Sequence, residues 1–240
     1  MKSIAFISLF FLHFSLFAQQ KISTIYLLSG LGSDERIFKN LSIDTQYNII
    51  YLPYSLPLEN ETIERYAGPM AEKVDTTEAF AIIGVSLGGI IAVEMTEYIH
   101  PEKVFLLSSV SSSDQVPGQY AFYAKHNLHK TLPAWMFKYS TFLLQPLYEP
   151  ERKAEKVTCN AMIKQKDALF MKRATAMLVN WKRTEEENNN ITIIQIHGSA
   201  DNTLPVENIQ ADHIIEGGSH MMTLIHAGSV SEIINTELAK

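Results

Sequence analysis

The sequence predicts an α/β fold, in which a mostly parallel sheet of about six strands carries helices on both faces. Three observations support this prediction. Short apolar runs alternate along the chain with segments of helical periodicity. Most of these runs lack an alternation of polar and apolar residues, as strands buried on both faces do. A glycine-rich turn joins one run directly to a helical segment, as a parallel sheet with crossover helices requires.

Six segments have the length and apolar character of strands. They cover residues 23–28, 47–52, 80–85, 104–108, 191–197 and 213–216. Helices are expected between and after them, at residues 33–40, 62–74, 87–99, 167–181 and 229–238. The helix at 167–181 begins with the acidic capping residue Asp167 and repeats apolar residues at helical spacing.

The region from residue 111 to about 166 has no strand candidate. It has helix candidates at 118–129, 133–144 and 150–163, separated by prolines and rich in aromatic residues. A helical insertion of this size after a strand can cover an active site, and its aromatic side chains would pack it onto the body. We therefore expect one domain, residues 19–240, with a helical cap at about 111–166.

The first eighteen residues have the layout of a secretory signal peptide. Lys2 is their only charge, the stretch from Ile4 to Phe17 is largely apolar, and the small residue Ala18 precedes a polar segment. The apolar stretch is shorter than the roughly 20 residues of a membrane span. The sequence thus predicts export to the periplasm or outside, with no stable membrane insertion after cleavage. An uncleaved anchor and a buried first helix are the alternatives.

The overall composition excludes several classes of protein. Apolar residues make up 46% of the 240 residues and charged residues 19%, which excludes a disordered chain and a polytopic membrane protein. The net charge of −6 provides no basic field for nucleic acid. The single cysteine, Cys159, cannot form an internal disulfide or a cysteine-based zinc site. No metal or organic cofactor is implied.

Residues 84–88 match the motif G-x-S-x-G, with Ser86 at its centre. The apolar run 80–85 leads into the motif and a helical pattern follows it. A sharp turn between a strand and a helix would expose the serine, and Gly84 and Gly88 would leave room around it. Ser86 is therefore the candidate nucleophile, while a glycine-rich packing turn is the alternative.

A serine hydroxyl needs a neighbouring base, and the base needs a group that orients it. His220 is the candidate base, because it follows the last strand candidate in a glycine-rich loop. Asp201 is the candidate acid, because it follows the run 191–197 and so lies at the same edge of the sheet. Asp114 is an alternative acid. His197 and His213 belong to predicted strands and are interpreted as structural.

Hydrolysis of an acyl group also needs N–H donors for the oxyanion. The backbone amide of Leu87, directly after the candidate nucleophile, is one expected donor. The amide of Leu31, in the glycine-containing loop after the first strand, is the other. That loop can alternatively be a tight connection capped by Ser33 or Asp34.

The chain order Ser86, Asp201, His220 resembles that of the α/β-hydrolase superfamily. The segments IQIHGSAD (194–201) and GGSH (217–220) are similar to those that carry the acid and the base in its small esterase-like members. The resemblance covers the whole mature chain and implies these roles for the three residues. Three features differ. The oxyanion loop begins Ser29-Gly30 instead of His-Gly, and the short interval between Asp201 and His220 predicts a trimmed connection. No strand candidate precedes Ser23, so a reduced, six-stranded version of the sheet is expected.

The predicted function is that of a serine hydrolase that cleaves carboxylic esters of small apolar substrates through an acyl-enzyme. The same triad also supports a thioesterase, an amidase or an acyltransferase. The alternative from a different functional class is a ligand-binding protein related to hydrolases, which keeps the triad and turns over slowly.

Overall fold

The computed structural model describes residues 21–118, 120, 125–188 and 190–240, so the predicted signal peptide lies outside the described residues. One sheet of parallel strands has the order β2-β1-β3-β4-β5-β6. The strands are β1 (Thr24–Leu28), β2 (Asn48–Tyr51), β3 (Phe80–Val85), β4 (Lys103–Leu107), β5 (Ile193–Gly198) and β6 (His213–Ile215). The predicted six-stranded parallel sheet is confirmed, and every strand bound falls within two residues of its prediction.

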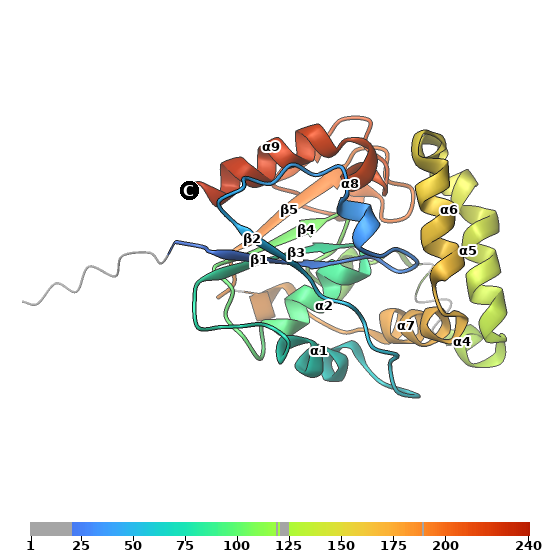
Figure 1. The fold of residues 1–240 in the computed structure, drawn as a ribbon. Helices are drawn as coiled ribbons and strands as arrows, with labels where there is room; N and C mark the ends of the chain where they lie inside the picture. Colours follow the sequence, from blue (N-terminus) through green and yellow to red (C-terminus); the bar gives the residue numbers. More distant parts are fainter. Residues whose placement is uncertain (1–20, 119, 121–124, 189) are drawn as a thin grey trace, which may run out of the picture.

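Helices cover both faces of the sheet (Figure 1). Alternate residues of β1 point to opposite faces, so Tyr26 and Leu28 belong to one apolar cluster and Ile25 and Leu27 to the other. The first cluster lies under α1 (Ile63–Ala71), α2 (Leu87–Met95) and α7 (Ala168–Asn180). The second lies under the short helix η1 (Glu35–Phe38), α8 (Met222–Ile225) and α9 (Ala227–Leu238).

Three helix predictions were too long, and one of them is 62–74, of which α1 covers only Ile63–Ala71. The segment 33–40 forms only the 3-10 turn η1, in which the Asp34 side chain accepts a hydrogen bond from the amide of Arg36. Asp34 thus caps the start of η1, as the alternative interpretation of this loop expected. The helix expected at 87–99 ends at Met95 and continues as turns. By contrast, Asp167 caps α7 as predicted, accepting from the amide of Phe170 at 2.8 Å.

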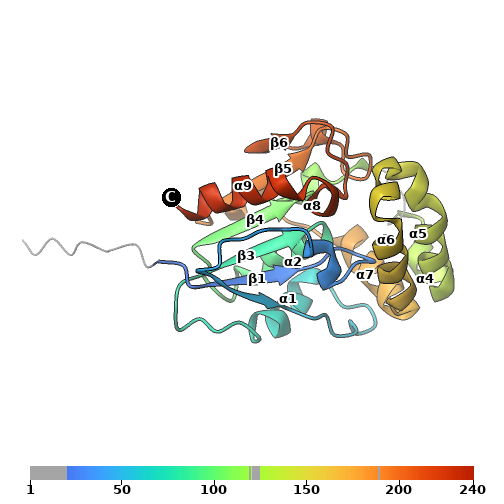
Figure 2. The same cartoon turned by 45° about the horizontal axis from the view of Figure 1, so that its top comes forward.

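The chain between β4 and β5 is helical in its described part. It contains η2 (Ser113–Gln115), α4 (Leu128–Thr131), α5 (Ala134–Tyr148), η3 (Pro150–Glu155), α6 (Lys156–Gln165), α7 and η4 (Glu185–Asn188). Part of the helix expected at 118–129 lies outside the described residues. Figures 1 and 2 show α5 and α6 standing across the end of the sheet to which the strands point. We call residues 111–166 the cap.

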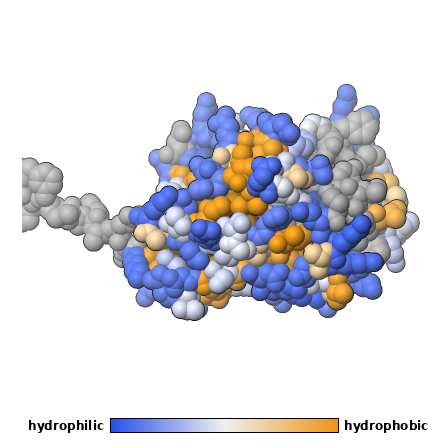
Figure 3. Space-filling model, turned by 90° about the horizontal axis from the view of Figure 1, so that it is seen from above, coloured by the Kyte–Doolittle hydropathy of each residue, from blue (hydrophilic) through white to orange (hydrophobic). Residues whose placement is uncertain are grey.

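The surface on the α9 side is largely hydrophilic, with separate apolar patches (Figure 3). Over the residues that the structure describes, no helix combines the length and apolar character needed to cross a bilayer.

Candidate active site

Ser86 stands on a strained turn between β3 and α2. Its backbone φ of 52° and ψ of −120° lie outside the regions that non-glycine residues normally adopt. Hydrogen bonds hold this conformation: the Ser86 amide donates to Leu107 O at 3.0 Å, and the Ser109 hydroxyl donates to Ser86 O at 2.7 Å. The turn places the Ser86 side chain at the carboxyl edge of the sheet, where it is half-buried.

Close backbone approach explains the glycines around this turn. A Cβ on Gly84 would lie 2.4 Å from the backbone of Gly89, and one on Gly88 would lie 2.2 Å from Leu28 O. Gly30 belongs to the loop after β1, and a Cβ there would lie 3.2 Å from Ser86 Cβ. These positions therefore need glycine so that β1, β3 and α2 can meet beside Ser86.

The structure brings Ser86, His220 and Asp201 into one hydrogen-bonded chain. Nε2 of His220 lies 2.9 Å from Ser86 Oγ, and its Nδ1 lies 2.8 Å from Asp201 Oδ2. The other carboxylate oxygen of Asp201 accepts from the amides of Thr203 and Leu204 at 2.9 and 2.8 Å. Asp201 is 4% exposed, so these donors replace water around its charge. The carboxylate is thus fixed to orient the His220 ring.

The two ionisable partners favour each other's charged forms. Burial alone would raise the pKa of Asp201, but the charge of His220 and the hydrogen bonds from His197, His220 and Leu204 lower it well below its usual range. Burial alone would lower the pKa of His220, but the charge and hydrogen bond of Asp201, with the charge of Glu149, raise it. A histidine that gains a proton is therefore stabilised at this position.

His197 contacts Asp201, which the interpretation of this histidine as structural did not anticipate. The fully buried ring places Nε2 2.7 Å from Leu204 O and 3.2 Å from Asp201 Oδ2. Asp201 thus lies between two histidines. The sequence offered one signal, since His197 and Asp201 are four residues apart at the end of one predicted strand. Asp114, the alternative acid, is exposed in η2, and no contact joins it to His220.

Two backbone amides are available beside Ser86. Leu87 is the first residue of α2, where the amide has no acceptor within the helix and the helix dipole favours a negative charge. Among the described residues, neither the Leu87 amide nor the Leu31 amide donates a hydrogen bond. The loop that carries Leu31 is held by Tyr54, whose hydroxyl donates to Ser29 O at 2.5 Å. The assignment of the Leu31 and Leu87 amides as oxyanion donors therefore stays a prediction.

Helix α5 of the cap and helix α7, which follows the cap, approach the same loop. A Cβ on Gly32 would lie 3.5 Å from Cε of Met171 in α7 and 3.8 Å from Cγ2 of Thr141 in α5. Met171 is buried, whereas Thr141 is partly exposed. An apolar thioether and a methyl group therefore face the loop that carries Leu31.

Comparison with solved structures places this arrangement in a known fold. A hydrolase from Pseudomonas aeruginosa superposes with a TM-score of 0.68 at 15% sequence identity, over 91% of this chain and 91% of that one. An enol-lactonase from Burkholderia xenovorans gives 0.65 at 15% identity, over 92% of each chain. A lipase-esterase related protein from Clostridium acetobutylicum gives 0.64 at 19% identity, over 90% of this chain and 94% of that one. The chain has the α/β-hydrolase fold. No protein-family model and no curated protein match the sequence.

Within this α/β-hydrolase fold, the connection between β5 and β6 is short. It contains only the 3-10 turn η5 (Val206–Asn208), in agreement with the trimmed connection predicted from the sequence. The loop after β6 then returns His220 directly over Ser86. In the part of the chain that the structure describes, no group of three or more His, Cys, Asp or Glu side chains is arranged to hold a metal ion.

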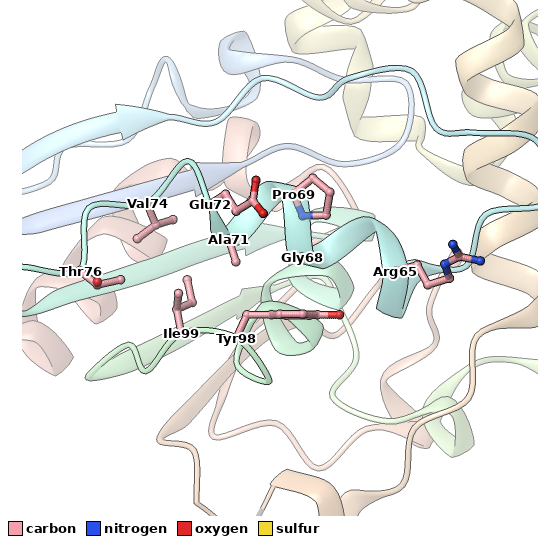
Figure 4. A pocket seen from close by; sticks show the side chains of 9 residues that line it. All are labelled: Arg65, Gly68, Pro69, Ala71, Glu72, Val74, Thr76, Tyr98 and Ile99. Carbon is pink, nitrogen blue, oxygen red and sulfur yellow. The ribbon is translucent and has the colours of Figure 1, made fainter.

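A separate hollow of about 640 Å³ lies between α1 and the turns after α2 (Figure 4). Its lining includes Arg65, Gly68, Glu72 and Tyr98. It is open to solvent and lies at the end of α2 opposite Ser86, so none of the candidate site residues lines it.

Proposed function

We propose that this protein is a serine hydrolase that cleaves carboxylic esters of small apolar substrates. The observation that carries the proposal is the chain of contacts from Ser86 Oγ to His220 at 2.9 Å and from His220 to Asp201 at 2.8 Å, on a strained strand-to-helix turn. Among the similar structures are a lipase-esterase related protein and an enol-lactonase, and their names add support for ester chemistry.

The proposed reaction has two steps. Ser86 Oγ attacks the ester carbonyl carbon while its proton passes to His220 Nε2, and the amides of Leu31 and Leu87 hold the oxyanion. His220 then gives the proton to the leaving alcohol, which departs and leaves an acyl-enzyme. A water molecule, deprotonated by His220, attacks that ester and releases the acid. Asp201 keeps the ring oriented and stabilises the imidazolium in both steps.

The proposed substrate is small and apolar because Met171 and the methyl group of Thr141 face the oxyanion loop. Export by the segment 1–18 is part of the proposal and rests on the sequence pattern alone. Exposure of the mature protein outside the cytoplasm would give it access to esters there.

A fluorophosphonate probe and a short p-nitrophenyl ester test the proposal together. The wild-type protein is expected to be labelled on Ser86 and to hydrolyse the ester. Ser86→Ala should lose both, with kcat reduced by roughly 10⁶-fold as for other serine nucleophiles. Ser229→Ala, which alters an exposed serine in α9, is the matched control and should behave as wild type.

Labelling without turnover of any ester in a panel would sink the esterase assignment while keeping the nucleophile. Thioesters, amides and alcohol acceptors would then be tried with the labelled site known. Absence of both labelling and turnover in the wild-type protein would overturn the hydrolase proposal itself.

A further inference from the structure

The cap contacts both loops that carry the candidate acid and base through one short segment, Glu149-Pro150-Glu151. Oε1 of Glu149 accepts a hydrogen bond from the Thr203 hydroxyl at 3.1 Å, two residues after Asp201. The carboxylate of Glu151 accepts from the Ser219 amide at 3.2 Å, one residue before His220. The cap therefore meets the Asp201 loop with one carboxyl group and the His220 loop with another.

The contact with Thr203 pairs only one of the two carboxylate oxygens of the buried Glu149. Glu149 is 2% exposed, and its Oε2 is fully buried and makes no hydrogen bond of ordinary geometry. Burying a carboxyl group without full pairing is costly. Burial raises the pKa of Glu149 and the charge of Asp201 adds to that rise, whereas the charge of His220 and hydrogen bonding from the Ser219 and Thr203 side chains oppose it. His220 is thus the cationic group that favours an ionised Glu149.

We propose that Glu149 is a positioning residue of the active site: the cap supplies a second carboxylate that, with Asp201, stabilises the protonated form of His220. This inference rests on the proposed function, because a protonated His220 arises when Ser86 transfers its proton. The proton moves to Nε2, and the positive charge then faces Asp201 at Nδ1 and Glu149 from the cap. A correctly docked cap would thereby increase the basicity of the base.

The surrounding charges single out Glu149 among the acidic groups of the cap. His220 contacts Asp201 at 2.8 Å, and the charges of Asp201 and of Glu149 raise the pKa of His220 against the effect of burial. Glu151 lies two residues on, but its carboxylate is partly exposed and pairs with His226 at 3.1 Å. His197 contacts the same Asp201 oxygen, Oδ2, as His220 does.

The expected sign follows from this arrangement. Glu149→Gln removes the negative charge but keeps an oxygen that can accept from Thr203. The protonated form of His220 then loses the charge of one of its two carboxylates, so its pKa should fall. Reaction of Ser86 requires deprotonated His220, so the rising limb of the pH profile should move to lower pH.

The decisive measurement is the second-order rate constant of fluorophosphonate labelling as a function of pH, since it depends on Ser86 and His220 without a choice of substrate. Glu149→Gln should shift the midpoint to lower pH. Glu151→Gln is the matched control, because it disturbs the same segment and the Ser219 contact yet should leave the midpoint in place. Glu149→Asp, which keeps the charge, should shift the midpoint less than Glu149→Gln.

An unshifted midpoint in Glu149→Gln, or an equal shift in Glu151→Gln, would overturn the inference while labelling of the wild-type protein keeps the proposed function. NMR titration of the His220 ring and the Glu149 carboxyl in the wild-type protein provides a test that needs no variant. Glu149 should be ionised over the range in which His220 titrates. A Glu149 that stays protonated through that range would also overturn the inference, whether or not the protein is labelled.

Discussion

The carboxyl edge of the sheet and the cap are built on different principles. At the sheet edge, backbones approach so closely that a Cβ would lie 2.2 Å from Leu28 O at Gly88 and 2.0 Å from Gly218 O at Gly198. In the cap, a Cβ on Gly118 would meet none of the described residues within 4 Å. The cap helix α5 also leaves apolar side chains in solvent, with Trp135 58% and Leu143 73% exposed.

The position of Ser86 and the attachment of the cap therefore depend on different kinds of contact. The position of Ser86 depends on backbone contacts that admit no added side chain. The described contacts of the cap with the body include individual side chains, such as Glu155 with Lys39 and Glu149 with Thr203. Single substitutions should therefore be far more damaging at the sheet edge than in the cap.

The largest expected effect tests the sheet edge directly. Gly88→Ala places a methyl group against the backbone of Leu28 and Ser29, which cannot move aside as a flexible side chain can. We expect the free energy of unfolding to fall by about 3 kcal/mol or more. Urea denaturation followed by circular dichroism measures this change.

Gly118→Ala is the corresponding change in the cap. Because the added methyl group meets open space there, the free energy of unfolding should change by less than about 0.5 kcal/mol. Similar losses in the two variants would contradict the contrast between the regions.

The sheet edge was also the part that the sequence predicted best. Buried parallel strands have continuous apolar runs, and the glycines around Ser86 mark a turn that only small residues permit. Ser86, Asp201 and His220 could be expected to lie close together, because each follows a strand and all these parallel strands end at one edge. The contact of Glu149 with Thr203 leaves no such pattern, because it joins residues 54 positions apart through the docking of the cap.

Helix ends were predicted less well for a related reason. The helix after Ser86 was expected to continue to residue 99 but ends at Met95. Beyond Met95 the chain continues through turns at residues 96–98, and Ile99 still packs into the core, so hydrophobicity alone does not reveal the end. Tertiary packing, which periodicity does not report, decides such boundaries.

A smaller effect is expected where the chain returns from the cap region to the body. Glu94 in α2 accepts from Trp181 Nε1 at 2.7 Å and pairs with Arg183 at 3.5 Å, and all three side chains are buried. Glu94→Ala leaves a buried N–H without an acceptor and weakens the pairing of Arg183, which keeps its contact with Glu97. The free energy of unfolding should fall by about 2 to 4 kcal/mol.

Glu94→Gln separates hydrogen bonding from charge at this junction. Burial raises the pKa of Glu94, with Trp181 and Arg183 acting against it. A carboxyl group whose pKa is raised on folding makes the folded protein less stable as the pH rises above the pKa that the group has in the unfolded chain. The stability of the wild-type protein relative to Glu94→Gln should therefore be greater near pH 4 than near pH 7, as judged by urea denaturation at both. The opposite trend would show that the charge pair with Arg183 dominates.

The smallest effect is expected at the exposed contact between the body and the cap. Lys39 Nζ lies 2.7 Å from both Glu155 Oε2 and Thr158 Oγ1, and Asn40 donates to the same carboxylate at 3.1 Å. The hydrogen bonds from Lys39, Thr158 and Asn40 lower the pKa of Glu155 to about 2. Solvent screens the pair, so Lys39→Ala should reduce the free energy of unfolding by less than about 1 kcal/mol.

The sign of the pH dependence sharpens this last prediction. A depressed carboxyl pKa contributes stability above its unfolded value and loses it as pH falls towards 2. The difference between wild type and Lys39→Ala in thermal melts should thus shrink as pH falls below about 4, and also in roughly 1 M salt. A salt-independent loss comparable to that of Gly88→Ala would mean that this exposed contact is coupled to the core. The contrast between a tightly built sheet edge and a loosely attached cap would then fail.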